Sequence, residues 1–153
     1  EERMGDLGDA MTVLAFTVQG MPLIYSGQEA GLNKRLSFFE KDTVDFSNTG
    51  RADFFKKLIK LKHENTAIWN GTYGGDYKRI KTTAEDDVFA FERTKGDNKV
   101  MVFLNLSDGK VSFEHFNDSV NAKLKDIFTG EEVELDRLKN ITLDAGGYWV
   151  LAK

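Results

Sequence analysis

Several residue types that build reactive sites are rare or missing in this sequence. Its 153 residues include no cysteine, one proline and two histidines. Without cysteine the chain has no disulfide, no thiolate ligand for a metal and no cysteine nucleophile. His63 and His115 have no partner at a metal-ligand spacing, so the sequence predicts no metal site. No run of about eighteen apolar residues is present either, and we expect no membrane-spanning helix.

An excess of basic charge is also absent. The net charge is −4 and the pI is about 5.3, which argues against a general nucleic-acid-binding surface. The 41% of hydrophobic and 30% of charged residues are typical of a soluble globular protein. The chain begins with Glu1-Glu2-Arg3, without an initiator methionine or a signal-peptide pattern, and we expect it to be cut from a longer protein.

Hydrophobic spacing in the amino-terminal part predicts two helices. Apolar residues three or four positions apart predict an amphipathic helix over residues 3–18. Its stripe consists of Met4, Leu7, Met11, Leu14 and Val18. A second helix is expected over residues 50–65, with Ser47, Asn48 or Thr49 as its cap. The predicted buried face of the second helix contains Phe54, Phe55, Leu58, Ile59 and Leu61, whereas Lys56, Lys57, Lys60 and Lys62 are predicted to face solvent.

A short buried strand is predicted between these helices. Pro22 suits the first position of a strand, and the apolar Leu23-Ile24-Tyr25 follows it. We therefore expect a strand over residues 21–25 and a long packed loop over residues 30–48. Helix, strand and helix in this order are typical of an α/β fold with a parallel sheet, whose other strands must lie upstream.

From Tyr73 onward the hydrophobic period changes to two, which predicts antiparallel strands. Gly96-Asp97-Asn98 predicts one hairpin loop, and Asp108-Gly109 predicts a second, two-residue hairpin. The last predicted strand is residues 148–151, in which Tyr148 and Trp149 should face opposite sides of the sheet. Short strands separated by turn signals are typical of a small β sandwich.

The segment around the predicted short strand resembles a signature of the α-amylase family, glycoside hydrolase family thirteen. In that family, a Gly-x-Pro-x-x-Tyr-x-Gly-x-Glu segment forms the eighth and last strand of the catalytic barrel. The matching positions here are Gly20, Pro22, Tyr25, Gly27 and Glu29. Weaker support comes from three segments in family order, residues 102–107, 126–131 and 147–151.

The resemblance implies an α+β fold. A helix–strand–helix remnant of the end of a (β/α)8 barrel is followed by an all-β antiparallel sandwich. Residues 1–71 are assigned to the barrel remnant, with the seventh helix, eighth strand and eighth helix, and residues 72–153 to the carboxyl-terminal β domain.

The resemblance also implies that the parent protein hydrolyses α-glucans, such as starch and maltooligosaccharides, with a retaining mechanism. Such a mechanism uses two carboxyl groups, which the family places on upstream strands, together with a third aspartate in an Asn-His-Asp motif. None of the three is in this chain, so it has no catalytic residue and should be inactive alone. Transglycosylase, isomaltase and branching activities remain open within the family, as does a non-catalytic carbohydrate-binding module from another class.

Candidate substrate-binding residues follow from the barrel architecture. The carboxyl ends of barrel strands face the active site, so Tyr25, Gln28 and Glu29 are expected near the substrate. The competing interpretation is that Glu29 anchors a turn by hydrogen bonds. Phe38 and Phe39 either stack on sugar rings or anchor the loop. A further stacking platform is conceivable from Trp69, Tyr73, Tyr77, Tyr148 and Trp149.

Expected partners follow from the same reasoning. We expect α-glucan as substrate through the parent barrel, no cofactor in this chain, and calcium only as a ligand of the parent. For a starch-degrading parent, an extracellular or periplasmic location is favoured. Helix 3–18 and strand 21–25 have lost their barrel neighbours, so they either fold back on the β domain or pair in a homodimer, and we favour the homodimer.

Overall fold

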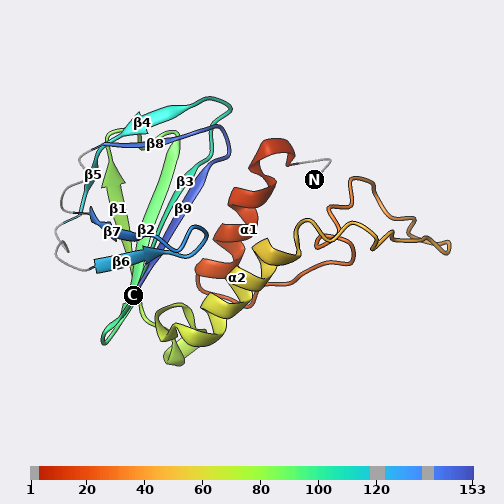
Figure 1. The fold of residues 1–153 in the computed structure, drawn as a ribbon, viewed down its shortest axis with the longest axis horizontal. Coiled ribbons are helices and arrows are strands. Elements are labelled where there is room, and N and C mark those ends of the chain that lie inside the picture. The colour runs from red at the N-terminus through yellow and green to blue at the C-terminus, as the bar shows by residue number, and fades with distance from the viewer. Residues whose placement is uncertain (1–3, 118–122, 136–139) are drawn as a thin grey trace.

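The computed structural model describes residues 4–117, 123–135 and 140–153. Two helices, α1 (Gly8–Thr17) and α2 (Ala52–Glu64), lie on one face of a seven-stranded sheet. A two-stranded ribbon covers part of the other face (Figure 1). The layers confirm the predicted α+β class with an antiparallel sandwich in its carboxyl-terminal part. None of the described helices is long and apolar enough to cross a membrane.

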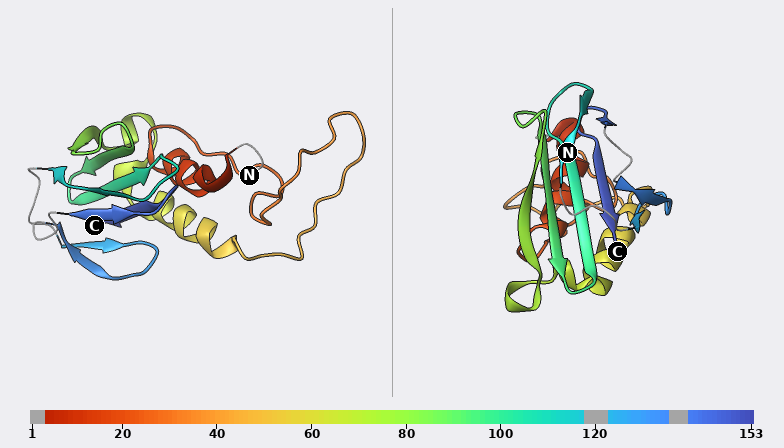
Figure 2. Two further views of the ribbon diagram at one scale, coloured as in Figure 1. Left: turned by 90° about the horizontal axis from the view of Figure 1, so that it is seen from above. Right: turned by 90° about the vertical axis from the view of Figure 1, so that its left-hand side faces the viewer.

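The large sheet is built around four adjacent strands, β1, β2, β3 and β9. Their bounds are Asp76–Thr82, Val88–Lys95, Asn98–Asn105 and Tyr148–Ala152. The order across the sheet is β5-β1-β2-β3-β9-β6-β7, and every described pair is antiparallel. The outer strands are β5 (His115–Phe116), β6 (Lys123–Asp126) and β7 (Glu132–Glu134), and the ribbon consists of β4 (Val111–Phe113) and β8 (Ile141–Leu143). Figure 2 shows the central strands side by side.

Alternation along the central strands creates a hydrophobic core on each face of the sheet. On the helix side, Phe91, Val102, Leu104 and Val150 pack with Val13, Phe16, Phe55 and Leu58. On the ribbon side, Ala90, Met101, Phe103 and Leu151 pack with Phe113 and Ile141. The predicted opposition of Tyr148 and Trp149 is confirmed, since Tyr148 joins the first core and Trp149 the second. Each such buried side chain contributes about 1.5–3 kcal/mol.

Helix α1 is present as predicted, but its buried face differs from the predicted stripe. A short 3₁₀ turn, η1 (Gly5–Leu7), precedes it, and residue 3 lies outside the described residues. The buried side chains are Ala10, Val13, Phe16 and Thr17, whereas Met4 is exposed and the rest of the stripe is half-buried. The reason is that α1 packs between α2 and strands β3 and β9, which cover a face that spacing alone does not identify.

Helix α2 confirms Phe55, Leu58 and Leu61 as its buried face, while Ile59 is exposed. The predicted side-chain cap is wrong. Arg51 occupies the cap position without a capping bond, and Asn48 instead accepts a hydrogen bond from the Gly50 N–H at 3.0 Å. A side-chain amide that accepts a hydrogen bond from a backbone N–H two residues ahead forms a local turn, and this turn competes with capping of the helix.

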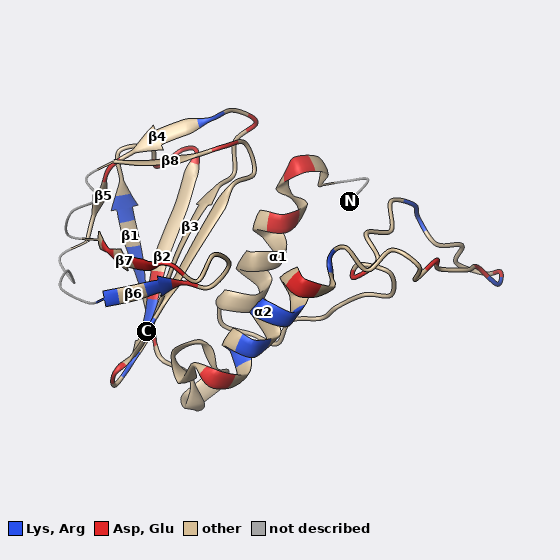
Figure 3. Cartoon of the chain, in the orientation of Figure 1, with Lys and Arg blue, Asp and Glu red and all other residues tan. Residues whose placement is uncertain are grey.

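The lysines of α2 do not all face solvent, although most lie on its outward side (Figure 3). Lys62 turns inward and donates to the Ile68 carbonyl at 2.6 Å and to Asn70 Oδ1 at 3.0 Å. Beside it, the fully buried Arg93 donates to the carbonyls of Trp69 and Gly75. Burial lowers the pKa of both groups. The two cations hold the connector of η2 (Thr66–Ile68) and η3 (Gly71–Tyr73), where the predicted boundary at residues 71 and 72 falls.

The predicted strand over residues 21–25 does not form. These residues have no regular secondary structure, and Met21 and Leu23 are 85% and 80% exposed. A strand is stabilised by backbone hydrogen bonds to a neighbour, and no described strand pairs with this segment. The chain from here to α2 leaves the body as a long loop (Figures 1 and 2).

The two hairpin predictions have opposite outcomes. Gly96-Asp97 closes a hairpin in which Lys95 pairs with Asn98, and Gly96 takes the left-handed conformation that the turn requires, with a φ of 57°. Asp108-Gly109 does not close a hairpin, because β4 leaves β3 and pairs with β8 instead.

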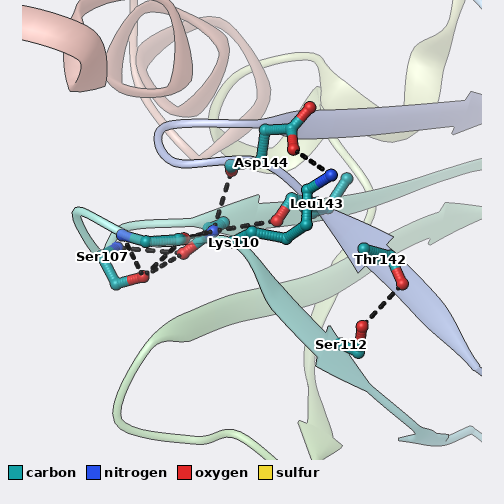
Figure 4. A network of polar contacts seen from close by, with 8 residues as sticks. Ser107, Lys110, Ser112, Thr142, Leu143 and Asp144 are labelled. Carbon is teal, nitrogen blue, oxygen red and sulfur yellow. Dashed lines mark hydrogen bonds and ion pairs between the residues drawn. The ribbon is translucent and has the colours of Figure 1, made fainter.

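Asn105, at the end of β3, explains this change of partner. Its fully buried side chain donates to the carbonyls of Gly109 at 2.7 Å, Asp144 at 2.8 Å and Leu143 at 3.2 Å. The oxygen of the same side-chain amide, Asn105 Oδ1, accepts hydrogen bonds from the N–H and the hydroxyl of Ser107. Figure 4 shows this network, with the Lys110–Asp144 ion pair and the Ser112–Thr142 hydrogen bond beside it. The turn after β3 is thereby tied to the turn after β8.

Candidate functional site

The predicted substrate residues lie in a turn that folds on itself. Tyr25 N–H donates to Gln28 Oε1 at 2.8 Å, and the backbone of Leu32 donates to the Gly27 carbonyl at 2.9 Å. Gly27 has a φ of 91°, and a Cβ there would lie 2.9 Å from the Leu32 side chain. Glycine is therefore required at this position. The turn fixes where Tyr25, Gln28 and Glu29 lie.

The three predicted residues have different surroundings. Gln28 closes the turn through its side chain, while the Tyr25 ring is 61% exposed. Glu29 is half-buried, and its Oε2 is buried without a hydrogen-bond partner among the described residues. Gln28, and not Glu29, is therefore the residue whose side chain anchors the turn by hydrogen bonding.

A hollow of about 350 Å³ opens beside this turn. Its walls include Tyr25, Ser26, Gln28, Lys34, Arg35 and Phe38. The structure thus brings two of the three predicted residues together with Phe38, from the loop that follows. Glu29 does not line this hollow. Lys34 pairs with Asp42 at 2.6 Å, and no described residue pairs with Arg35.

Ser26 and Arg35 were not predicted from the sequence as site residues. Both lie in a segment without hydrophobic periodicity, so only the course of the backbone reveals that they face the same hollow as Tyr25. Asp42 was also missed as an organising residue. Its carboxylate accepts from the N–H groups of Ser37 at 3.0 Å and Thr43 at 2.7 Å, and from the Lys34 ammonium. The hydrogen bond from Lys34 is the largest of the effects that lower the Asp42 pKa to about 2.

The proposed stacking platform on the β domain is not assembled. Trp149 is half-buried in the ribbon-side core, and its indole N–H donates to Asp126 Oδ2 at 2.9 Å. Tyr77 stacks on Phe91, with ring centroids 5.3 Å apart. Trp69 and Tyr73 are exposed, but in the described part of the chain no ring contact joins them. These rings do not form one continuous aromatic surface.

Two larger hollows, each of about 560 Å³, lie away from the predicted residues. One lies at the start of α1, beside the ion pair of Asp9 and Arg51, and the other between α2 and the turn after β6. Among the residues that the structure describes, no group of three or more histidine, aspartate or glutamate side chains could hold a metal ion.

Comparison with known proteins supports the family resemblance. The family model of the maltogenic amylase C-terminal domain matches residues 80–150, from within β1 to within β9. Residues 80–150 therefore belong to the maltogenic amylase C-terminal domain family, and the chain as a whole is similar to the C-terminal part of α-amylase-family proteins. An intracellular maltogenic amylase of Bacillus subtilis (strain 168) is 28% identical over 153 residues, which cover 94% of this chain and 24% of that protein. A cyclomaltodextrinase of Thermoanaerobacter pseudethanolicus is 32% identical over 109 residues, which cover 66% of this chain and 17% of that protein.

Solved structures of α-amylase-family proteins share the fold. A noncanonic maltogenic α-amylase from Thermotoga neapolitana superposes with a TM-score of 0.79 at 17% identity, covering 97% of this chain and 36% of that chain. An α-amylase from Geobacillus thermoleovorans, complexed with acarbose, superposes with a TM-score of 0.67 at 23% identity. The match covers 95% of this chain and 31% of that chain. The chain spans 17–24% of the length of the curated relatives named above, so most of each family protein has no counterpart here.

Proposed function

We propose that the protein to which this chain belongs hydrolyses the α-glucosidic bonds of starch and maltooligosaccharides with retention of configuration. The observation that carries the proposal is the match of residues 80–150 to the maltogenic amylase C-terminal domain. The Gly20–Glu29 pattern, which resembles the last barrel strand of the family, supports it. Relatives named as a cyclomaltodextrinase and a neopullulanase support α-glucans as the substrate class.

The role of this chain within that activity is structural support. A retaining mechanism needs a nucleophile and a general acid about 5 Å apart, and the resemblance assigns both to strands upstream of this chain. The chain supplies the end of the barrel and the β domain, and the packing of α1 and α2 on the sheet joins the two. A calcium ion, if the parent binds one, belongs to the parent's other residues.

The proposal predicts that activity depends on the upstream part. Starch incubated with the full-length protein should release reducing ends, whereas the 153-residue chain should release none above a buffer control. The physical reason is that the isolated chain lacks both carboxyl groups of the mechanism. Activity of the isolated chain at the full-length rate would contradict the assignment of the catalytic groups to the upstream part. An upstream sequence that encodes no barrel would contradict the proposal that the parent is an enzyme.

Products distinguish hydrolysis from the alternatives within the family. Chromatography of a maltotriose digest should show only shorter sugars if the protein is a hydrolase. Longer sugars or new branch points would assign a transglycosylase or a branching enzyme. The burial of Trp149 in the core weighs against a carbohydrate-binding module built on the predicted platform.

The remaining expectations concern location and partners. An extracellular or periplasmic location stays a prediction, and one relative is named an intracellular maltogenic amylase. We propose no nucleic-acid or membrane partner, because the net charge is −4.

A further inference from the structure

Asn70 and Gly71 form the only asparagine–glycine pair in the sequence. The pair lies in the connector between α2 and β1, where Asn70 is half-buried and Gly71 is exposed. Glycine has no side chain to shield its backbone nitrogen, so this nitrogen can attack the side-chain carbonyl of a preceding asparagine and displace its amide as ammonia. A chemically reactive pair thus lies at the junction between the helices and the sheet.

The attacking and the leaving nitrogen of this pair are both free of hydrogen bonds to the described residues. Neither the Gly71 N–H nor the Asn70 Nδ2 group donates to any of them. A Cβ built on Gly71 would meet nothing within 4 Å, so the Gly71 nitrogen has space to approach Asn70 Cγ. The turn itself is held by two 3₁₀-type hydrogen bonds of 3.2 Å, a type with poorer geometry than that of an α-helix.

Lys62 places a positive charge at the carbonyl that is attacked. Its Nζ donates to Asn70 Oδ1 at 3.0 Å, and further hydrogen bonds to the Ile68 carbonyl at 2.6 Å and the Gly20 carbonyl at 3.1 Å hold it there. Attack on Cγ moves negative charge onto Oδ1, and a cationic donor already aimed at that oxygen stabilises the charge. Lys62 therefore promotes the reaction of Asn70.

The surroundings of Lys62 also lack a negative charge. Arg93 is fully buried, and its Nε and Nη1 atoms have no hydrogen-bond partner among the described residues. No acidic side chain within residues 4–117, 123–135 and 140–153 forms an ion pair with Lys62 or Arg93. Burial, and then repulsion by Arg93, lowers the pKa of Lys62. Buried charge without compensation is costly, so a carboxylate at position 70 would be stabilising.

We propose that Asn70 is a self-modification site, which deamidates and supplies the carboxylate that Lys62 and Arg93 lack. The Gly71 nitrogen bonds to Asn70 Cγ, and the Asn70 amide nitrogen leaves as ammonia with the proton from Gly71. Water then opens the cyclic imide, which restores the Gly71 N–H and leaves a carboxylate in aspartate or isoaspartate linkage. The overall reaction converts an amide and water into a carboxylate and ammonium.

Peptide mapping by mass spectrometry, after incubation of the 153-residue chain at neutral pH, tests the reaction. The peptide with Asn70 should gain the mass of an amide-to-acid conversion, whereas Asn98, which lysine follows, should keep its amide. Lys62→Met should slow the conversion about fivefold or more, because it removes the donor to Oδ1. Lys62→Arg keeps a cationic donor and should convert at nearly the wild-type rate. An unmodified wild-type chain, or an unchanged or faster conversion of Lys62→Met, would overturn the proposal.

The variant Asn70→Asp reproduces the aspartate product and tests its role without the reaction. Its carboxylate should raise the melting temperature by about 2–4 °C, the shift expected of one charge-assisted contact in a chain of this length. In the Lys62→Met background the same substitution should give no increase, because the contact has lost its cation. A melting temperature that does not rise, or a rise that persists without Lys62, would overturn the role of the product as a counter-charge.

Discussion

At the scale of single residues, Asn105 determines where β4 goes. Replacing it with alanine removes an amide that serves the carbonyls of Gly109, Leu143 and Asp144. Losing these three part-buried hydrogen bonds from a fully buried side chain should lower the free energy of unfolding by about 2–4 kcal/mol. Urea denaturation measures the change. Ser112→Ala is the control, because its partner Thr142 lies on the exposed side of the ribbon, and an equal loss there would contradict the assigned role.

Gly146 is a second residue with a large predicted effect. It has a φ of 63°, and a Cβ at this position would lie 2.2 Å from the carbonyl oxygen of Asp6. Gly146→Ala should therefore cost about 2 kcal/mol or more, since it adds a steric clash to the strain of a left-handed residue.

The matched control is Gly130→Ala. Gly130 has a φ of 81°, but a Cβ there meets only the end of the Lys125 side chain at 3.6 Å. Its cost should be the backbone strain alone, about 1 kcal/mol. Equal melting temperatures of the two variants would show that the contact between η1 and the turn before β9 contributes nothing.

At the scale of elements, the loop around Phe38 should respond to acid. The folded pKa of Asp42 is about 2, below its ordinary value of 3.8. The ionised carboxylate therefore stabilises the loop fully at pH values above 3.8. That contribution should disappear as the pH falls through about 2. Amide shifts of Ser37 and Thr43 report it, and Asp42→Asn should abolish their titration. A midpoint near 4 would mean that the Lys34–Asp42 contact is absent in solution.

The elements also show what a sequence can predict. Where a pattern and its partner lie in the same chain, as in the hairpin of β2 and β3, the prediction is confirmed. The strand at 21–25 failed because its pattern specifies burial, while the neighbouring strands that would bury it are not among the described elements. The second hairpin failed because Asn105 ties the turn at Asp108-Gly109 to the distant carbonyls of Leu143 and Asp144, and these contacts outweigh the local turn signal.

The candidate site could likewise be predicted only in part. Tyr25 and Gln28 could be predicted, since a motif marks them, and the structure places both at one hollow. Arg35, Ser26 and Asp42 could not be predicted, because their placement depends on the path of a loop without periodicity. Whether an aromatic pair such as Phe38 and Phe39 packs inward or outward also depends on that path.

At the scale of the whole molecule, the exposed apolar side chains of residues 21–25 predict self-association. Helix α1 is covered by α2 and the sheet, so it is not the surface on which a homodimer would form. Met21 and Leu23 remain open, and contiguous exposed apolar groups promote pairing. Sedimentation at micromolar concentration should show a dimer that Met21→Ser/Leu23→Ser weakens. A wild-type monomer at every concentration would contradict the homodimer.

The packing of α1 on β9 orders events during synthesis. The helix leaves the ribosome before the strand beside it, Tyr148–Ala152, has been made. Ala10, Val13 and Phe16 therefore stay without part of the surface they cover until β9 has been translated. Contacts so distant in sequence slow folding and prolong the exposure of apolar surface. A nascent chain stopped before β9 should accordingly expose the apolar face of α1 to chaperones, and release from them should require the synthesis of β9.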